Sequence, residues 1–106
     1  MRYRHSKYNA KKTVVDGITF DSQKEARRYG ELKILQKAGK ITALKVHPVY
    51  SIDIEDCHIC NVELDFSYKD DWLRKHNEDV KGRDLPMSRL KRKLLSALYG
   101  ITVELT

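Results

Sequence analysis

Residues 61–68 alternate strictly between polar and apolar side chains, and this alternation constrains the fold more than any other stretch of the chain. Successive residues of a β-strand point to opposite faces of the sheet, so the pattern predicts a strand over residues 59–68. Asp65 then lies near the middle of the polar face. Antiparallel strands often turn such a face to water, and the alternation alone therefore predicts a half-solvated strand.

A second acidic residue follows Asp65 fourteen positions later, in the sequence Asp79-Val80-Lys81. In a strand predicted over residues 72–81, Asp79 and Lys81 point to the same face, and Glu78 points to the other. If this strand pairs with the first, Asp65 joins them in a cluster of two carboxylates and one ammonium group. Such a cluster can hold a hard divalent cation beside a phosphate.

The approach to Asp79 is unusual for a central strand. Residues 73–78 are almost all polar, whereas central strands favour β-branched and aromatic residues. A turn is predicted at residues 69–71, and the first half of the following strand is expected to protrude as a ribbon.

A helix is predicted from Ser22 to about Ala38. Ser22 and Glu25 have the spacing of a capping box, and Gly39 suits the position after the last helical residue. At 100° per residue Glu25 also falls on the apolar side of the helix, where a carboxylate needs a partner such as a cation or Lys81. Glu25 is therefore either a cap, a site residue, or both.

The remaining elements follow from shorter patterns. Asp16-Gly17 between β-branched residues predicts a tight hairpin over residues 13–20. Further predictions are strand-like sequence over residues 41–54 broken at Pro48, a turn at 55–58, a helix from Met87 that stops at Gly100, and a short strand at 101–105.

Size and composition indicate one folded domain. The 106 residues suffice for a single modest core, which we place in residues 13–106 behind a basic arm at residues 1–12. The hydrophobic fraction of 41% beside 34% charged residues is typical of a globular chain. No apolar run has the length of a membrane span or a signal peptide, so a cytoplasmic protein without membrane contact is expected.

The net charge of +6 is unevenly distributed. Residues 1–12 carry +5, residues 83–106 carry +3, and the middle of the chain carries −2. Basic ends around an acidic centre suit a polyanion held at the flanks and cations held in the middle. An ordinary solvated surface, a loose N-terminal arm and a polar helix face are the alternatives. The candidate DNA-binding residues are Arg2, Arg4, Lys7, Lys11, Lys12, Arg89, Lys91, Arg92 and Lys93.

Cys57 and Cys60 have the spacing of a zinc-binding pair. A closed zinc site needs four ligands, and the chain offers no second cysteine pair. The histidines at positions 5, 47 and 76 also lack ligand spacing. Two reduced cysteines near a turn are therefore expected, and a zinc-linked interaction module shared across a dimer is the weaker alternative.

Taken together, the order of elements and the Asp…Asp-x-Lys pattern resemble the PD-(D/E)XK nuclease superfamily across nearly the whole chain. The resemblance implies a restriction-endonuclease-like α/β (α+β) core, with a mixed β-sheet flanked by two helices and an N-terminal hairpin. Three segments are also similar to a small phage-encoded family of unknown function grouped with these nucleases: KYNAKKTVVDGITFDSQKEARRYGELKILQKAG, EDVKG and RLKRKLLSALYGI. Two departures are the polar residues 74–77 and Leu64, where some members have proline.

The resemblance also assigns roles. Asp65 matches the metal-binding aspartate, Asp79 the acidic residue of the (D/E)xK pair, and Lys81 the lysine that orients the attacking water. Glu25 matches a glutamate on the first helix of archaeal Holliday-junction resolvases and related enzymes. Mg²⁺, for which Mn²⁺ can substitute, would then be held by Asp65, Asp79, Glu25 and the carbonyl of Val80.

These expectations combine into a metal-dependent DNA endonuclease. A chain of this size has little room for a sequence-reading module, so branched or structured DNA bound by a homodimer is the expected substrate. If the gene is carried by a phage, the protein acts in the cytoplasm of the bacterial host. The alternative is a catalytically inactive, nucleic-acid-binding accessory protein with the same fold.

Overall fold

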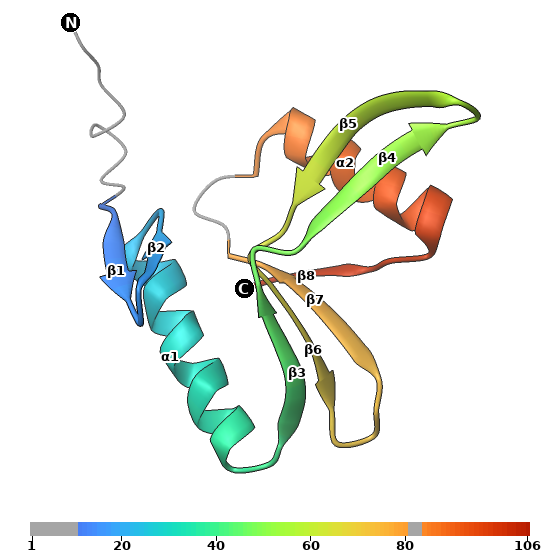
Figure 1. Cartoon of the computed structure of the whole chain (residues 1–106). Coiled ribbons are helices and arrows are strands. Elements are labelled where there is room, and N and C mark those ends of the chain that lie inside the picture. Colours follow the sequence, from blue (N-terminus) through green and yellow to red (C-terminus); the bar gives the residue numbers. More distant parts are fainter. Residues whose placement is uncertain (1–10, 81–83) are drawn as a thin grey trace, which may run out of the picture.

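The computed structural model describes residues 11–80 and 84–106, which form an α+β fold of two helices and eight strands (Figure 1). This agrees with the fold class predicted from the sequence. In chain order the elements are β1 (Thr13–Val15), β2 (Ile18–Phe20), α1 (Gln23–Lys37), β3 (Ile41–Val46), β4 (Val49–Ile54), β5 (Cys57–Glu63), β6 (Phe66–Asp70), β7 (Lys75–Asp79), α2 (Pro86–Tyr99) and β8 (Val103–Leu105).

The chain begins its described part with the predicted hairpin. β1 and β2 pair antiparallel, and Asp16 and Gly17 both have positive φ, at 54° and 75°. These angles are those of a two-residue turn of type I′, which explains why Asp-Gly is favoured there. The hairpin packs on α1, and the Tyr29 hydroxyl donates a hydrogen bond of 2.8 Å to Asp16 Oδ2.

Helix α1 has the two ends that the sequence predicts. The Ser22 side chain accepts a hydrogen bond of 3.1 Å from the Glu25 backbone N–H, and Gly39 takes the left-handed conformation with φ 79°. Between these ends the helix buries Ala26, Tyr29 and Leu32. These side chains pack with Phe20, Ile41, Phe66 and Tyr68 in a first hydrophobic cluster.

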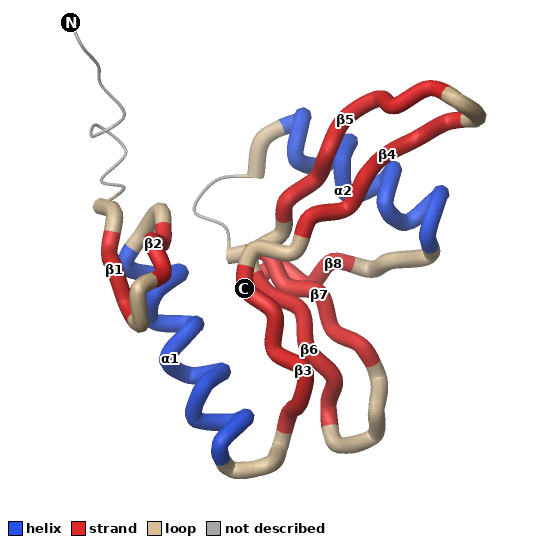
Figure 2. Tube along the Cα trace, in the orientation of Figure 1, coloured by secondary structure: helices blue, strands red, loops and turns tan. Residues whose placement is uncertain are grey.

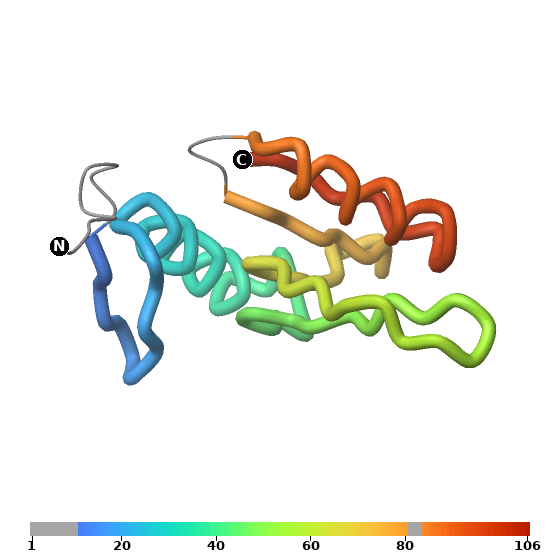
Figure 3. The backbone as a smooth tube through the Cα atoms, turned by 90° about the horizontal axis from the view of Figure 1, so that it is seen from above, coloured from blue at the N-terminus to red at the C-terminus, as the bar shows by residue number. Residues whose placement is uncertain are grey.

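The central sheet has the strand order β3-β6-β7-β8. β3, β6 and β7 are antiparallel neighbours, and β8 adds parallel to β7, so the sheet is mixed as predicted. β4 and β5 pair only with each other and form an arm that extends from the sheet (Figure 2). Helix α2 packs against β4, and the view in Figure 3 shows it on the opposite side of the molecule from the β1–β2 hairpin.

A second hydrophobic cluster joins this arm to α2. It consists of Ile52, Val62, Leu64 and Leu95, with half-buried side chains such as Val103 packed around them. The fold therefore has two cores, one under α1 and one under α2.

The predicted continuous strand over residues 59–68 is wrong. β5 ends at Glu63 and β6 begins at Phe66, and Leu64 and Asp65 form a bend between them. The reason is that β5 pairs with β4 in the arm, whereas β6 pairs with β3 and β7 in the central sheet. The alternation continues through the bend because each half of the segment serves a different core. Ser67, predicted to face water, is buried.

The predicted strand over residues 72–81 is too long at its start. β6 runs to Asp70 and β7 begins only at Lys75, so the turn lies at Asp71–Arg74 and not at residues 69–71. The Asp70 side chain fixes the turn after residue 70, because its Oδ1 accepts the backbone N–H groups of Trp72 and Arg74, both at 2.9 Å. The turn predicted at residues 55–58 is shorter as well, since β5 already begins at Cys57.

Candidate functional site

Three potential metal ligands meet where the chain leaves the central sheet for the arm and returns. Glu25, His47 and Asp65 each place one ligand atom within 4.8 Å of the others. Glu25 comes from the first turn of α1 and is 5% exposed. His47 lies between β3 and β4, and Asp65 lies between β5 and β6.

Backbone hydrogen bonds hold these two connections side by side. His47 has a φ of 56°, which turns the chain sharply before Pro48. The His47 N–H donates to the Asp65 carbonyl, and the Leu64 N–H donates to the Pro48 carbonyl, each at 2.9 Å. His47 and Asp65 are thereby fixed relative to each other by main-chain contacts.

The Glu25 carboxylate contacts the imidazole of His47, with 2.7 Å between Oε1 and Nε2. The inward orientation of Glu25 predicted from the helix is thus present together with the cap, because its backbone N–H bonds to Ser22 while its carboxylate faces the sheet. The partner of that carboxylate in the structure is a histidine.

Asp79 adds a further carboxylate to this group. It ends β7, is largely buried, and shares a side-chain hydrogen bond with Asp65. The Asp65 Oδ2 atom also accepts the backbone N–H of Val80 at 2.5 Å. The structure therefore places Asp65 beside both Glu25 and Asp79, around a chain bend in place of a continuous strand.

The electrostatics of Asp65 reflect this crowding. Burial is the largest effect and, with the hydrogen bond to Asp79 and the charges of Glu25 and Asp79, raises the pKa of Asp65 to about 8. The Val80 N–H opposes the rise. Carboxylates this close cannot all ionise without compensation, so the cluster favours a bound proton or a bound cation.

Glu78, the neighbour of Asp79, faces the opposite side of the sheet and belongs to a different network. It is 1% exposed and accepts two hydrogen bonds from Arg28 of α1, of 2.8 and 2.7 Å, and one from the Tyr68 hydroxyl. Burial opposes ionisation of Glu78, but the bonds from Arg28 and Tyr68 outweigh it and lower its pKa. Its exclusion from the candidate metal ligands agrees with this geometry.

Two basic residues of α2 border the same site. A small cavity of about 130 Å³ is lined by Asp79 together with Ser88, Lys91 and Arg92. Arg92 pairs with Asp84 at 2.9 Å, while its other terminal nitrogen, Nη1, is buried and has no hydrogen-bond partner among the described residues. Two cationic side chains, Lys91 and Arg92, thus line a cavity beside Asp79, and their charge suits an anion.

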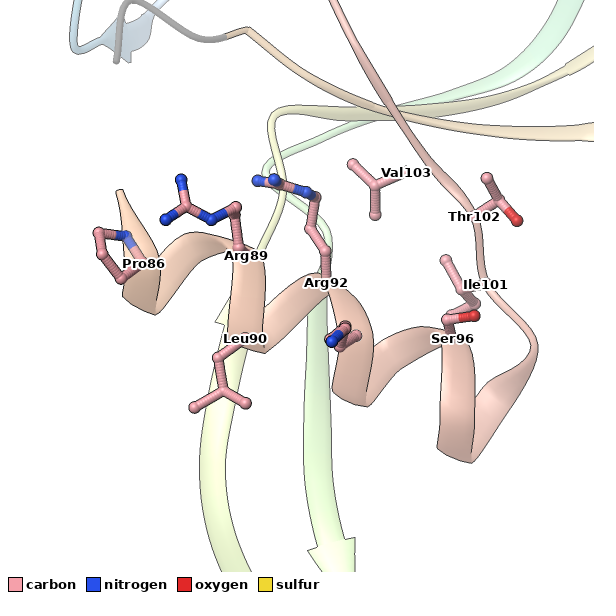
Figure 4. Close-up of a pocket in the computed structure, with 9 residues that line it drawn as sticks. Pro86, Arg89, Leu90, Arg92, Ser96, Ile101, Thr102 and Val103 are labelled. Carbon is pink, nitrogen blue, oxygen red and sulfur yellow. The ribbon is translucent and has the colours of Figure 1, made fainter. Parts of the chain in front are cut away.

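A larger cavity of about 590 Å³ lies along α2 and its connection to β8. Figure 4 shows Arg89 and Arg92 pointing to one side of α2, toward Val103, with Leu90 on the other side. Lys93 also lines this cavity. The four cationic residues predicted on this helix therefore border two adjoining cavities.

Some predicted residues fall outside the described part of the chain. These are Arg2, Arg4, Lys7 and Lys81, and the predicted position of Lys81 beside Asp79 stays a prediction. Lys11 and Lys12 are exposed just before β1. Val80 is described and contributes its N–H to Asp65.

Cys57 and Cys60 do not belong to this carboxylate–histidine cluster. Cys57 is exposed and Cys60 half-buried, both with free thiols on β5. The His58 side chain between them bonds to Asp53 and Ser51 of β4. Over residues 11–80 and 84–106, the group of three metal-ligand candidates includes neither cysteine.

His47 is the site residue that sequence analysis missed. It lacks ligand spacing to any other histidine or cysteine, and its partners are carboxylates brought close only by the fold. The available signal is its place before Pro48, at the break between two strands. Connections carry functional residues more often than the elements they join.

The fold and the site together define a small α+β protein with a carboxylate–histidine cluster at the crossing of two chain connections. A family model described as "Protein of unknown function (DUF1064)" matches residues 5–106, and the chain belongs to this family. No curated protein and no solved structure matches the chain. Among the described residues, no helix is long and apolar enough to cross a membrane.

Proposed function

We propose that this protein is a metal-dependent DNA endonuclease of the PD-(D/E)XK type. The observation that carries the proposal is the position of Asp65, at a chain bend, beside both Glu25 of α1 and Asp79 at the end of β7. Carboxylates grouped around Asp65 in this way favour a positive charge beside them. Lys81, two residues after Asp79, completes the sequence pattern of that superfamily.

The donor atoms of the cluster fit a divalent cation. Carboxylate oxygens suit Mg²⁺ and Mn²⁺, and an imidazole nitrogen suits Mn²⁺ better than Mg²⁺. Asp65 and Asp79 would hold the cation together with Glu25 and His47. The presence of His47 leads us to expect tighter binding of Mn²⁺ than of Mg²⁺.

The proposed reaction is hydrolysis of a phosphodiester bond. A bound cation supplies charge neutralisation at the phosphate and makes a nearby water more acidic. Lys81 is expected to orient the attacking water or a phosphate oxygen through its point charge. Lys91 and Arg92 support the proposal, because they border the cavity on Asp79 and would hold a neighbouring phosphate of the same strand.

Branched or structured DNA is the proposed substrate and a homodimer the proposed active form. The chain has one small domain of 106 residues, and the contacts to phosphates that we propose carry no sequence information. Resolving a four-way junction requires cuts in two strands. The two sites of a homodimer would each bind one of these strands. Met87, Leu90 and Leu98 are exposed on α2 and would be available to such a dimer contact.

The test is cleavage of a labelled four-way junction, a linear duplex and a single strand in Mg²⁺ or Mn²⁺. Wild type should cut the junction, whereas Asp79→Asn and Lys81→Ala should lose activity by at least about a hundredfold. Asp56→Asn, at an exposed position in the β4–β5 turn, is the matched control and should cut normally. Absence of cleavage by wild type under all these conditions contradicts the enzymatic proposal.

A nucleic-acid-binding accessory protein is the second candidate, and one observation favours it. The Asp65 carboxyl is hydrogen-bonded to Asp79, and the Glu25 carboxylate already contacts His47, so these groups have partners without a cation. The cleavage assay separates the two functions. Junction binding without cleavage in either metal, unchanged by Asp79→Asn, assigns the accessory role.

A further inference from the structure

The turn between β6 and β7 presents two large apolar side chains to solvent. Trp72 is 76% exposed and Leu73 is 75% exposed, the highest values among the exposed large hydrophobic residues described. Trp72 is also the only tryptophan in the sequence. Exposure of one such side chain is ordinary, but two adjacent ones at the tip of a hairpin form an apolar projection.

This tip is held in a defined shape. Asp70 closes the turn by accepting the N–H groups of Trp72 and Arg74 at 2.9 Å, and the Leu73 N–H bonds to the Asp70 carbonyl at 2.9 Å. The other carboxylate oxygen of Asp70, Oδ2, contacts Nε2 of the His76 ring at 2.8 Å. A side chain presented by a rigid turn loses little conformational freedom when it binds.

The base of the tip carries three cations beside the two carboxylates of Asp70 and Asp71. Lys69 and Lys75 stand directly opposite each other across β6 and β7, and both are exposed. Like charges in this arrangement destabilise a sheet unless something negative compensates them. Arg74 adds a third exposed cation beside the tip, with its Nε 3.6 Å from Asp70 Oδ2, and the net charge of residues 69–75 is +1. The pairing of an apolar tip with a cationic base fits a polyanion that also offers flat apolar surfaces.

We propose that the Trp72–Leu73 tip inserts against unpaired or unstacked bases at a branch in DNA, while Lys69, Arg74 and Lys75 contact the flanking phosphates. Aromatic side chains stack on any base, and apolar side chains wedge between base steps that are already weakened. A second copy of this tip docked on the first would bring like net charge together, so a nucleic acid is the better partner for this surface. The proposal rests on the proposed function, and it names the structural feature of the substrate that is recognised.

The tip and the carboxylate cluster lie at opposite ends of the same two strands. Asp65 precedes β6 and Asp79 ends β7, whereas the tip follows β6 and precedes β7 (Figure 1). Five residues of strand span roughly 17 Å, which is about five steps along a DNA strand. Cleavage is therefore expected about five nucleotides from the branch point that the tip engages.

The single tryptophan allows a direct test on the full-length protein. Emission from Trp72 is recorded during titration with a four-way junction, a matched linear duplex and phosphatidylserine vesicles, in EDTA so that no cleavage occurs. Stacking on bases should quench the emission with the junction far more than with the duplex. Equal quenching by both DNAs, or a blue shift with vesicles alone, overturns the proposal.

Affinity for a labelled junction is then measured by fluorescence anisotropy on variants. Trp72→Ala should weaken junction binding about tenfold or more and leave duplex binding nearly unchanged, and Trp72→Phe should restore part of the loss. Ile59→Ala is the matched control, because Ile59 is an exposed apolar residue of the arm at 51% exposure, and it should bind like wild type.

The outcomes distinguish failure of this inference from failure of the proposed function. If wild type binds the junction and Trp72→Ala binds it equally well, the tip has no role although the protein binds DNA. If wild type binds none of the DNAs, the proposed function fails and the tip proposal fails with it. If Trp72→Ala changes a dimer into a monomer on size-exclusion chromatography with light scattering, the tip contacts a second copy and the proposal is overturned.

Discussion

Replacing Asp65 by asparagine should stabilise the protein in the absence of metal while removing its response to metal. The asparagine side chain has nearly the same shape. Its oxygen can accept the Val80 N–H, and its amide can donate to Asp79, so both contacts of Asp65 can be kept without a charge. The change therefore isolates the electrostatic cost of placing a third carboxylate in the cluster.

The magnitude and its pH dependence follow from the pKa of Asp65, which rises from 3.8 to about 8 in the folded protein. The folded-state pKa of Asp65 lies above the unfolded value. The stability that the wild-type protein gains from protonated Asp65 is therefore complete below about pH 4 and is lost as pH rises through 8. The full difference would correspond to roughly 5–6 kcal/mol at pH 9. Because Asp65 is only half-buried and water screens its charge, we expect about 1–2 kcal/mol.

The assay is urea denaturation followed by circular dichroism, since the exposed Trp72 is a poor reporter of unfolding. In EDTA at pH 9, Asp65→Asn should unfold at higher urea concentration than wild type, and the difference should vanish at pH 4. Mn²⁺ at a hundred times its dissociation constant should stabilise wild type by about 2.7 kcal/mol and the variant hardly at all. If the variant is less stable at pH 9, or if Mn²⁺ stabilises both proteins equally, our account of the cluster is wrong.

Three further predictions concern other parts of the structure. Arg28→Met should destabilise the fold by about 3 kcal/mol in denaturant titrations, because it leaves the buried Glu78 carboxylate without its cation. His76 bonds to Asp70 and Glu104, and these bonds raise its pKa. The stability that His76 contributes should therefore be present below about pH 6.5 and be lost as pH rises. His76→Gln should flatten that part of a profile of melting temperature against pH. His47→Ala should weaken Mn²⁺ binding in calorimetry more than Mg²⁺ binding, and equal losses would exclude a direct contact.

Local patterns predicted the elements whose ends are chemically marked. The Asp16-Gly17 turn, the Ser22 cap of α1 and the stops at Gly39 and Gly100 are each fixed by one residue type that suits one backbone conformation. Such signals depend on a few neighbours in sequence, so tertiary contacts do not override them.

The predicted element boundaries differ from the structure where a local sequence pattern fits two arrangements equally well and only tertiary contacts select one. The alternation through Asp65 fits one long strand as well as two short ones, and only the separate partners of β5 and β6 settle the choice. The start of β7 was misplaced because the closure of its turn depends on the side chain of Asp70. Burial of both faces of β6 likewise follows from packing that alternation cannot show.

The carboxylates of the candidate site are recognisable in the sequence, but its imidazole is not. Asp65 and Asp79 stand out because each is acidic within a predicted strand, and Glu25 because it falls on an apolar helix face. His47 has no such context, since its contact with Glu25 spans 22 residues and depends on a backbone with positive φ. A ligand set drawn from a helix, two connections and the end of a strand is visible only after the chain has been folded.

The bend at Asp65 has a mechanical consequence. Leu64 belongs to the core under α2 and Phe66 to the core under α1, so Asp65 is the residue at which this segment passes between the halves of the fold packed around each core. A cation that fixes Asp65 against Glu25 and Asp79 would also restrict the angle between these halves. Amide hydrogen exchange in β4, β5 and α2 should then slow on metal binding, although none of these elements supplies a ligand, because opening of one half would first require release of the ion.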